Sequence, residues 1–342
     1  MAENEAATIT APTAHPFTIE NVPKPQPGPG QLVIRNAAVA INPADWKVQT
    51  FGGYPNKYPF ILGHDAAGIV EEVGPNVTRF KKGQRVIAHC SGFLTRDAAN
   101  GGFQLYPMVN ESLTAEIPES LPFEQAVVLP LVISTAASGL YPEDCLNLPL
   151  PVVDGVKKTG QTLLVWGGAS STGSTTIQLA VASGLTVVTT ASPSNHDFVL
   201  SLGAQAVFDY RSPSVVEDIA NALTNTEFVG VYDAISEEPS FKAISAILDR
   251  LETAVKVISV LPYDKPTEHF APKFVMAFGL IQEPNREIGE WIWGTYVPQA
   301  LEKGSLKPKP DPYVVGTGLK DIQHGVDVLK KGVSAQKVVV TL

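Results

Sequence analysis

A run of small side chains at residues 167–173, Gly-Gly-Ala-Ser-Ser-Thr-Gly, follows an apolar segment and precedes a helix-length segment. Small residues are required where a backbone approaches a pyrophosphate, and the amides and dipole of a helix N-terminus receive its negative charge. The spacing is GxxSxxG, with serine where the usual glycine pattern has its middle glycine. We therefore predict a dinucleotide-binding turn, with contacts from Gly167, Gly168, Ser170, Ser171, Thr172 and Gly173.

The loop after the next predicted strand indicates which dinucleotide binds. A domain that prefers NAD usually presents Asp or Glu there, bonded to the ribose hydroxyls. Residues 190–195 are Thr-Ala-Ser-Pro-Ser-Asn, without a carboxylate. Hydroxyl and amide donors suit a 2′-phosphate, so the sequence predicts NADPH as the cofactor. The expected contacts are Ser192, Ser194 and Asn195, with Tyr210 from the next strand end, whereas Arg211 is equally consistent with an ordinary loop residue.

Two kinds of segment must position these groups. Short apolar runs broken by Gly, Pro and Asn fill residues 31–130 and predict a β-rich, barrel-like domain. From about residue 160, strand-like and helix-length segments alternate, which predicts βαβ units on a parallel sheet. A final apolar strand is expected to pair with the first domain. The predicted class is α/β, a Rossmann-type doubly wound sheet plus a β-rich domain, divided as 1–131, 132–276 and 277–342.

Composition excludes several classes of function. The formal charge of −9 disfavours nucleic acid as a partner. The sequence has no run of about 18 or more apolar residues that could span a membrane. The two cysteines, Cys90 and Cys145, are far apart, which excludes a disulfide framework and a four-cysteine zinc site. A cytoplasmic protein of about two domains is the expectation.

The segment GHDAAGIV, residues 63–70, resembles the GHExxGxV signature of the medium-chain dehydrogenase/reductase superfamily. With Asn-Pro-Ala-Asp at residues 42–45, the small-residue turn and the terminal strand, the resemblance covers essentially the whole chain. It implies that the β-rich domain is GroES-like and that its two sequence parts flank the Rossmann domain.

Zinc alcohol dehydrogenases of that superfamily carry a metal-binding cysteine where this chain has Asn42, and a four-cysteine lobe that this sequence lacks. A catalytic zinc needs three suitable protein ligands, and His64 with Asp65 does not supply them. We therefore predict no metal, with His64 as a packed histidine. The NPxD motif resembles the quinone oxidoreductase and enoyl reductase branch. Residues 45–47 (Asp-Trp-Lys), residues 192–195 and the Trp-containing tail resemble fungal trans-acting enoyl reductases.

The resemblance implies roles for further residues. Tyr54 is expected as a proton donor or enolate stabiliser, with an aromatic lid as the alternative, while Asn42 and Lys47 are expected near the reacting groups. Cofactor contacts are implied for Asp45, Lys47, Thr135, Val260, Leu261 and Lys337, and substrate contacts for Leu129, Leu131, Ile133, Met276 and Phe278.

Together these features predict NADPH-dependent hydride transfer to a conjugated C=C bond in an enone, enoyl thioester or quinone. The apolar lining suggests a small hydrophobic or acyl substrate, and a polyketide synthase is a candidate partner of a monomeric or homodimeric enzyme. Two alternatives are an aldehyde or ketone reductase and a non-catalytic NADPH-binding protein.

Overall fold

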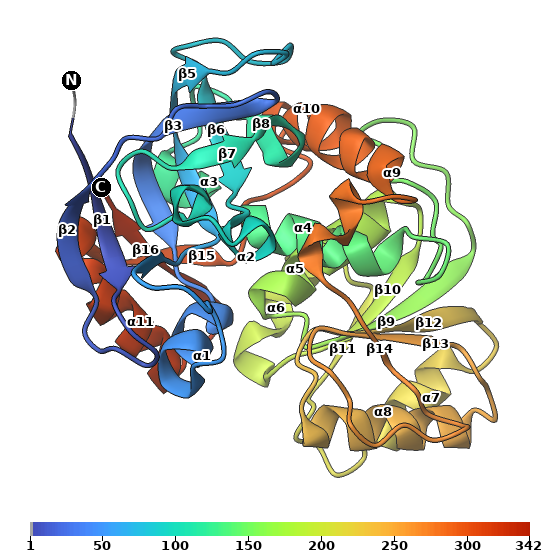
Figure 1. Ribbon diagram of the computed structural model, residues 1–342. Coiled ribbons are helices and arrows are strands. Elements are labelled where there is room, and N and C mark those ends of the chain that lie inside the picture. Colours follow the sequence, from blue (N-terminus) through green and yellow to red (C-terminus); the bar gives the residue numbers. More distant parts are fainter. Residues whose placement is uncertain (1–2) are drawn as a thin grey trace. The chain divides into compact units, whose positions relative to one another are not determined.

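The computed structural model describes residues 3–342, and its contacts divide the chain into two units (Figure 1). Unit 1 takes the chain up to Leu131, together with Trp293–Gly304 and Pro308–Leu342. Unit 2 takes Val132–Ile292 and Ser305–Lys307. In this division residues 277–292 lie with unit 2.

Unit 1 is built on a sheet of seven strands, most of them antiparallel, in the order β15-β16-β3-β5-β6-β8, with β7 also paired to β3. The last strand of the chain, β16, pairs antiparallel with β3 through Val339 and Ala40, so the C-terminus completes the sheet of the N-terminal part. A smaller sheet has the order β2-β1-β4. The strands are β1 (Asn4–Ile9), β2 (Thr18–Val22), β3 (Gln31–Ala40), β4 (Phe60–Ile61), β5 (Asp65–Val73), β6 (Arg85–His89), β7 (Met108–Asn110), β8 (Thr114–Glu116), β15 (Asp311–Thr317) and β16 (Gln336–Thr341).

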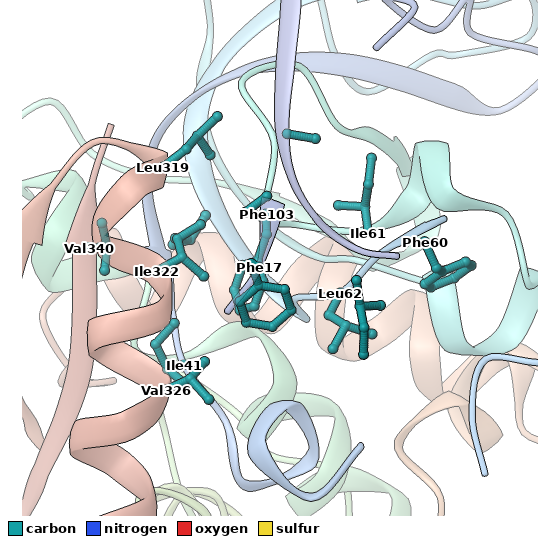
Figure 2. Close-up of a cluster of buried hydrophobic side chains, with 14 of the residues drawn as sticks. Phe17, Ile41, Phe60, Ile61, Leu62, Phe103, Leu319, Ile322, Val326 and Val340 are labelled. Carbon is teal, nitrogen blue, oxygen red and sulfur yellow. The ribbon is translucent and has the colours of Figure 1, made fainter. Parts of the chain in front are cut away.

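The core of unit 1 joins segments from both ends of the sequence (Figure 2). Helix α11 (Ile322–Lys331) places Ile322 and Val326, four residues apart, on one face, and this face packs beside Ile41 and Val340. Phe17 and Phe103 meet edge to face next to them, with ring centroids 6.1 Å apart. The apolar face of the final helix is therefore buried only because the chain returns to the N-terminal sheet.

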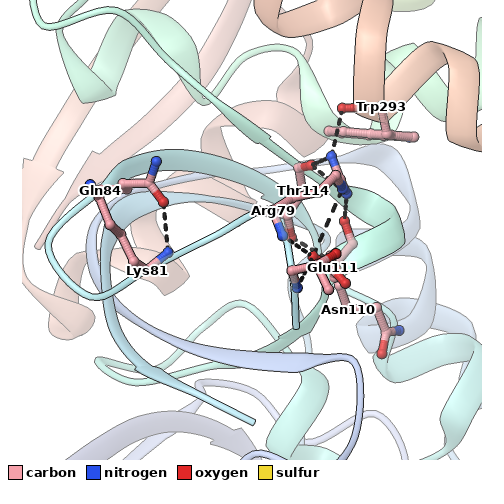
Figure 3. Close-up of polar contacts among 8 residues, drawn as sticks. Arg79, Lys81, Gln84, Asn110, Glu111, Thr114 and Trp293 are labelled. Atoms are coloured by element: carbon pink, nitrogen blue, oxygen red, sulfur yellow. Dashed lines mark hydrogen bonds and ion pairs between the residues drawn. The ribbon is translucent and has the colours of Figure 1, made fainter. Parts of the chain in front are cut away.

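Arg79 ties the return segment of unit 1 to its sheet (Figure 3). Its guanidinium donates to the carbonyl of Trp293 at 3.3 Å and to the carbonyl of Thr114 at 3.4 Å, and it also bonds the carbonyl of Glu111. The Glu111 carboxylate accepts the backbone N–H of Arg79 at 2.7 Å, which fixes the arginine from the other side. Trp293 lies in a π-helical turn, Ile292–Tyr296, that leads into α10 (Val297–Glu302).

Unit 2 contains a parallel sheet of six strands in the order β11-β10-β9-β12-β13-β14. The chain adds strands on one side of β9 and then on the other, so the order reverses between β9 and β12. In doubly wound sheets, ligands bind at that switch point, outside the carboxyl ends of the strands. The strands are β9 (Gln161–Trp166), β10 (Thr186–Thr190), β11 (Ala206–Phe208), β12 (Glu227–Asp233), β13 (Lys256–Ser259) and β14 (Lys273–Phe274).

Helices cover this sheet as the alternation in the sequence predicts. Val231 of β12 is fully buried against Ile244 of α8, and Ile219 of α7 belongs to the same core. The helices in unit 2 are α5 (Ser171–Ala182), α6 (His196–Ser201), α7 (Val215–Leu223), α8 (Glu238–Arg250) and α9 (Arg286–Trp291). The chain enters unit 2 through α4 (Pro130–Leu140), and unit 1 also has α1 (Pro43–Phe51), α2 (Gly92–Thr95) and α3 (Phe123–Ala126).

One segment in residues 3–342, Phe123–Leu140, is long and apolar enough to match a membrane span by composition. Most of it, 72%, is buried inside the protein. It therefore lies mostly in the interior of the folded chain.

Candidate active site

The small-residue turn of unit 2 connects β9 to α5 at the switch point of the sheet. Gly167 has a φ of +80°, in the left-handed region that favours glycine. Its N–H donates to Thr190 Oγ1 at 2.9 Å. At Gly173 a Cβ would lie 2.2 Å from the carbonyl oxygen of Gly167, so only glycine lets the helix pack this closely on the turn.

Ser170, which replaces the middle glycine, is the N-cap of α5. Its Oγ accepts the N–H of Gly173 at 3.0 Å, so the side chain folds back onto its own helix. The half-buried Ser171 and Thr172 follow in the first helical turn. The backbone here therefore keeps the form of a phosphate-binding turn, with the positive end of a helix dipole behind it.

The loop after β10 gathers the donors predicted for a 2′-phosphate. Ser192 Oγ lies 3.2 Å from Ser194 Oγ and accepts from Asn195 Nδ2 at 3.0 Å. Tyr210, 46% exposed, follows β11, and the guanidinium of the adjacent Arg211 lies over its ring. The structure thus brings two hydroxyls and an amide together at the end of β10, and their contact with a cofactor stays a prediction.

A buried carboxylate that the sequence reasoning missed organises the neighbouring strand ends. Asp233 ends β12, and its Oδ1 accepts the N–H of Ser236 at 2.9 Å while Oδ2 accepts from Ser240 Oγ at 2.6 Å. Burial raises the pKa of Asp233, although its hydrogen bonds oppose this. Ser236 Oγ in turn accepts the N–H of Val260 at 2.8 Å, which fixes a predicted cofactor contact. The sequence did contain a signal for this carboxylate, since an acidic residue ends an apolar predicted strand there.

The residues predicted to line substrate differ in exposure. Within unit 2, Ile133 is fully buried and Phe278 is 8% exposed, whereas Met276 is 60% exposed. Thr135 is half-buried, and its carbonyl accepts from the Tyr232 hydroxyl at 2.7 Å. In unit 1, Leu129 is fully buried, while Leu131 is partly exposed, as is Leu261 of unit 2. Their contacts with substrate or cofactor stay predictions.

Unit 1 contains a buried polar cluster of Lys337, Asp65 and Asn42. Lys337 Nζ donates to Asn42 Oδ1 at 2.5 Å and lies 3.2 Å from Asp65 Oδ2. Asn42 Nδ2 donates to the same carboxylate oxygen at 2.7 Å, which closes the ring of three side chains. Asp65 Oδ1 accepts the N–H of Leu131 at 2.6 Å. The side-chain amide of Asn42 thus bonds mainly to these two charged neighbours, and it is buried rather than exposed to solvent.

Asp45 lies in the same region and has a structural environment. Its Oδ2 accepts the N–H of Asn42 at 2.7 Å, and its Oδ1 accepts the N–H of Gly63 at 3.2 Å. Complete burial raises the pKa of Asp45 to about 7, against the effect of these hydrogen bonds. Asp45 therefore anchors the start of α1 to the GHD segment. The neighbouring Lys47 is partly exposed, and its Nζ lies 5.7 Å from the ring centroid of Trp46.

Tyr54 and His64 meet at the ring of Phe93. The Tyr54 ring centroid lies 4.3 Å from that of Phe93, and its hydroxyl donates to the carbonyl of Gly92 at 2.8 Å. The His64 ring centroid also lies 4.3 Å from that of Phe93, and neither nitrogen of His64 has a hydrogen-bond partner among residues 3–342. Burial lowers the pKa of His64 to about 4, so the imidazole is neutral. Burial also raises the pKa of Tyr54, which keeps the phenol protonated.

These side chains do not fit a zinc ion. The ammonium of Lys337 holds the oxygens of Asn42 and Asp65, and its charge repels a divalent cation from them. Among residues 3–342, no three or more His, Cys, Asp or Glu side chains gather closely enough to bind a metal. The chemistry of unit 1 must therefore be derived from hydrogen bonds and fixed charges.

Comparison with known proteins identifies relatives of the whole chain. Residues 28–119 match the family model of the alcohol dehydrogenase GroES-like domain. A trans-enoyl reductase of Aspergillus japonicus is 44% identical over 91% of this chain and 90% of its own. An alcohol dehydrogenase superfamily protein of Novosphingobium aromaticivorans has a TM-score of 0.80 at 28% identity, with 99% of each chain covered. A mycobacterial protein solved with NADPH shares the fold, with a TM-score of 0.73 at 24% identity over 99% of this chain and all of its own.

Proposed function

The chain belongs to the medium-chain dehydrogenase/reductase superfamily, and from that membership we propose that it is an NADPH-dependent reductase of conjugated C=C bonds. Its substrates are an enone, an enoyl thioester or a quinone. The observation that carries the proposal is the Lys337–Asp65–Asn42 cluster, because it replaces a metal-binding donor set with an internal cation. Reduction of a conjugated C=C bond needs no metal, since a hydrogen-bond donor such as the Tyr54 hydroxyl can meet the enolate charge.

Unit 2 fits a nicotinamide dinucleotide. The turn from Gly167 to Gly173 and the N-terminus of α5 would hold the pyrophosphate, and Ser192, Ser194 and Asn195 would meet the 2′-phosphate. Bound NADPH supplies a hydride from its nicotinamide C4. Val260, fixed through Ser236 and Asp233, would support the orientation of the nicotinamide ring.

The proposed proton donor is Tyr54. The phenol carries its proton at neutral pH, because burial raises the pKa of Tyr54 further above neutrality, so the hydroxyl can donate to the substrate, although a pKa nearer neutrality would make it a stronger acid. The hydroxyl already donates to Gly92, and turning it toward substrate exchanges one acceptor for another. Lys47, which is partly exposed, is proposed to bind the cofactor, and Asn42 to act by holding Lys337 and Asp65 in place.

We also propose that the acyl substrate arrives as a thioester on a polyketide synthase in the cytoplasm. The support is the likeness to a protein named as a trans-enoyl reductase, since a reductase acting in trans takes its substrate from a separate protein. The apolar side chains Leu131 and Met276, which are partly or largely exposed, would suit an acyl chain.

Reduction with NADPH deuterated at C4 tests this function. An α,β-unsaturated acyl thioester and an aliphatic ketone serve as parallel substrates, and mass spectrometry locates the label. We expect deuterium at the β-carbon of the thioester and no label in the ketone. Label at a carbinol carbon would make the protein a carbonyl reductase. Tight NADPH binding without turnover of either substrate, or of a quinone, would make it a non-catalytic binding protein.

A further inference from the structure

The cluster of Lys337, Asp65 and Asn42 joins segments that are distant in sequence. Asn42 precedes α1, Asp65 begins β5, Lys337 lies in β16, and Asp65 also bonds Leu131 in the first turn of α4. We propose that Lys337 is a positioning residue whose buried ammonium holds the Asp65 carboxylate in place to fix Leu131. This inference rests on the proposed function, in which Leu131 lines the substrate site.

The backbone pairing of β16 and the burial of the side chain fix the position of Lys337. It is 4% exposed, and the adjacent Val338 accepts the N–H of Ile41 at 2.9 Å, next to Asn42. On the other edge of β16, Lys337 is in register with Pro312 of β15. Because the strand is paired on both sides, its backbone cannot shift easily. If the side chain left the cluster, Asp65 would remain as an unpaired buried charge, which is strongly unfavourable. Such a lysine is suited to a fixed contact rather than to reaching a mobile ligand.

Asp65 transmits this constraint to the start of α4. The first backbone N–H groups of a helix have no partner within the helix, and its N-terminus carries partial positive charge. With Pro130 at the first position of α4, the N–H of Leu131 is the first such donor, and it meets Asp65 Oδ1 at 2.6 Å. A carboxylate from β5 therefore caps α4 from outside the helix and sets the position of Leu131.

Asn42 makes the arrangement specific. Its Oδ1 accepts from Lys337 and its Nδ2 donates to Asp65 Oδ2, so the amide binds both members of the ion pair and orients them. Asp65 Oδ1 is then left for Leu131, and Oδ2 is left for Lys337 and Asn42. Each oxygen of the carboxylate has its own task, which a neutral side chain at residue 65 could not reproduce with equal strength.

The test compares Lys337→Met, which removes the charge and keeps most of the bulk, with Asp65→Asn, the double variant and a control. The control is Lys331→Met, which removes an exposed lysine from α11 of the same unit. Three quantities are measured: the KM and kcat for an enoyl thioester, the Kd for NADPH from fluorescence titration, and deuterium uptake by mass spectrometry in peptides containing Leu131.

We expect Lys337→Met to raise the KM for the thioester about tenfold and to speed exchange near Leu131, a coupling of the size that contacting charges show. The Kd for NADPH and the kcat should each stay within about twofold of wild type, because the lysine acts through Leu131. The double variant should exchange more slowly than Lys337→Met, since it has no unpaired buried charge. Asp65→Asn should exchange faster than wild type, because its neutral oxygen accepts more weakly.

Two results overturn the proposal. One is a Kd for NADPH weakened about tenfold or more with unchanged exchange near Leu131, which would make Lys337 a cofactor contact. The other is behaviour of Lys337→Met that matches Lys331→Met in all three measurements. If Lys337→Met does not fold, Asp65→Asn and the double variant decide by the same exchange criterion. A wild-type protein that reduces no enoyl substrate refutes the proposed function, while the exchange data still decide on the positioning of Leu131.

Discussion

Substituting Gly173 by alanine should disable the phosphate-binding turn without unfolding the chain. Glycine to alanine inside a helix normally stabilises by about 1 kcal/mol, because alanine is the better helix former. At Gly173, however, the new Cβ would lie 2.2 Å from the carbonyl oxygen of Gly167 and 2.9 Å from the Cα of Gly168. Those atoms belong to the turn itself, so relief of the clash must move the turn. Overpacking of this kind costs about 1–3 kcal/mol, which offsets or exceeds the gain in helix propensity.

The loss should appear in cofactor binding rather than in stability. A displaced turn that gives up about 1.4 kcal/mol or more of its interaction with NADPH weakens binding at least about tenfold. Fluorescence titration gives the Kd, and urea unfolding gives the free energy of unfolding. The matched control is Gly279→Ala, also in unit 2, where the nearest atom to an added Cβ is Ser138 Oγ at 4.0 Å. Its Kd should equal that of wild type.

Wild-type affinity in Gly173→Ala, with Gly279→Ala also unchanged, would refute the assignment of this turn as the pyrophosphate site. A large loss of unfolding free energy in Gly173→Ala would instead show that the clash disrupts the packing of α5. In that case the weaker binding would follow from unfolding, and the argument from turn geometry would fail as well.

Three further predictions follow from the site. Tyr54→Phe should lower the single-turnover rate of NADPH oxidation by about 10²-fold or more and leave the Kd for NADPH unchanged, whereas Lys47→Ala should mainly weaken NADPH binding. If the rate of Tyr54→Phe stays within about twofold of wild type, Tyr54 is only an aromatic lid. The Asp45 pKa is raised from 3.8 to about 7, so its contribution to stability is present below pH 3.8 and is lost as pH rises toward 7. As pH rises from 5 to 8, the free energy of unfolding of Asp45→Asn, measured in urea, should therefore rise by about 3 kcal/mol relative to that of wild type. If the free energies of the two proteins change in parallel with pH, the pKa of Asp45 is not raised. In titrations, wild type should bind NADPH more tightly than NADH, and Ser192→Ala or Tyr210→Phe should reduce the difference between the two affinities. Equal affinities of wild type for the two cofactors would contradict the inference of NADPH from the loop without a carboxylate.

The parts of this protein that local sequence determines were predictable. The alternation of strands and helices after residue 160 predicted the parallel sheet, and the small-residue turn was placed correctly between β9 and α5. The return of the C-terminal strand to the N-terminal sheet was also predicted and is confirmed by the pairing of β16 with β3. The role of Ser170 was not predicted, since only the geometry shows that its hydroxyl caps α5. A substitution in a glycine motif can thus preserve the backbone by folding its side chain onto the helix.

Contacts between distant residues could not be predicted in the same way. Lys337 and Asn42 are 295 residues apart, and a lone lysine in an apolar terminal strand gives no hint of its partner. The family resemblance implied only that this lysine reaches the cofactor. The structure supplies a different partner within unit 1, a carboxylate and an amide that are both buried. Because this charge is already paired inside the protein, we propose that Lys337 has a positioning role rather than a binding role. The same reasoning applies to Asn42, whose amide bonds both the buried Lys337 and the buried Asp65.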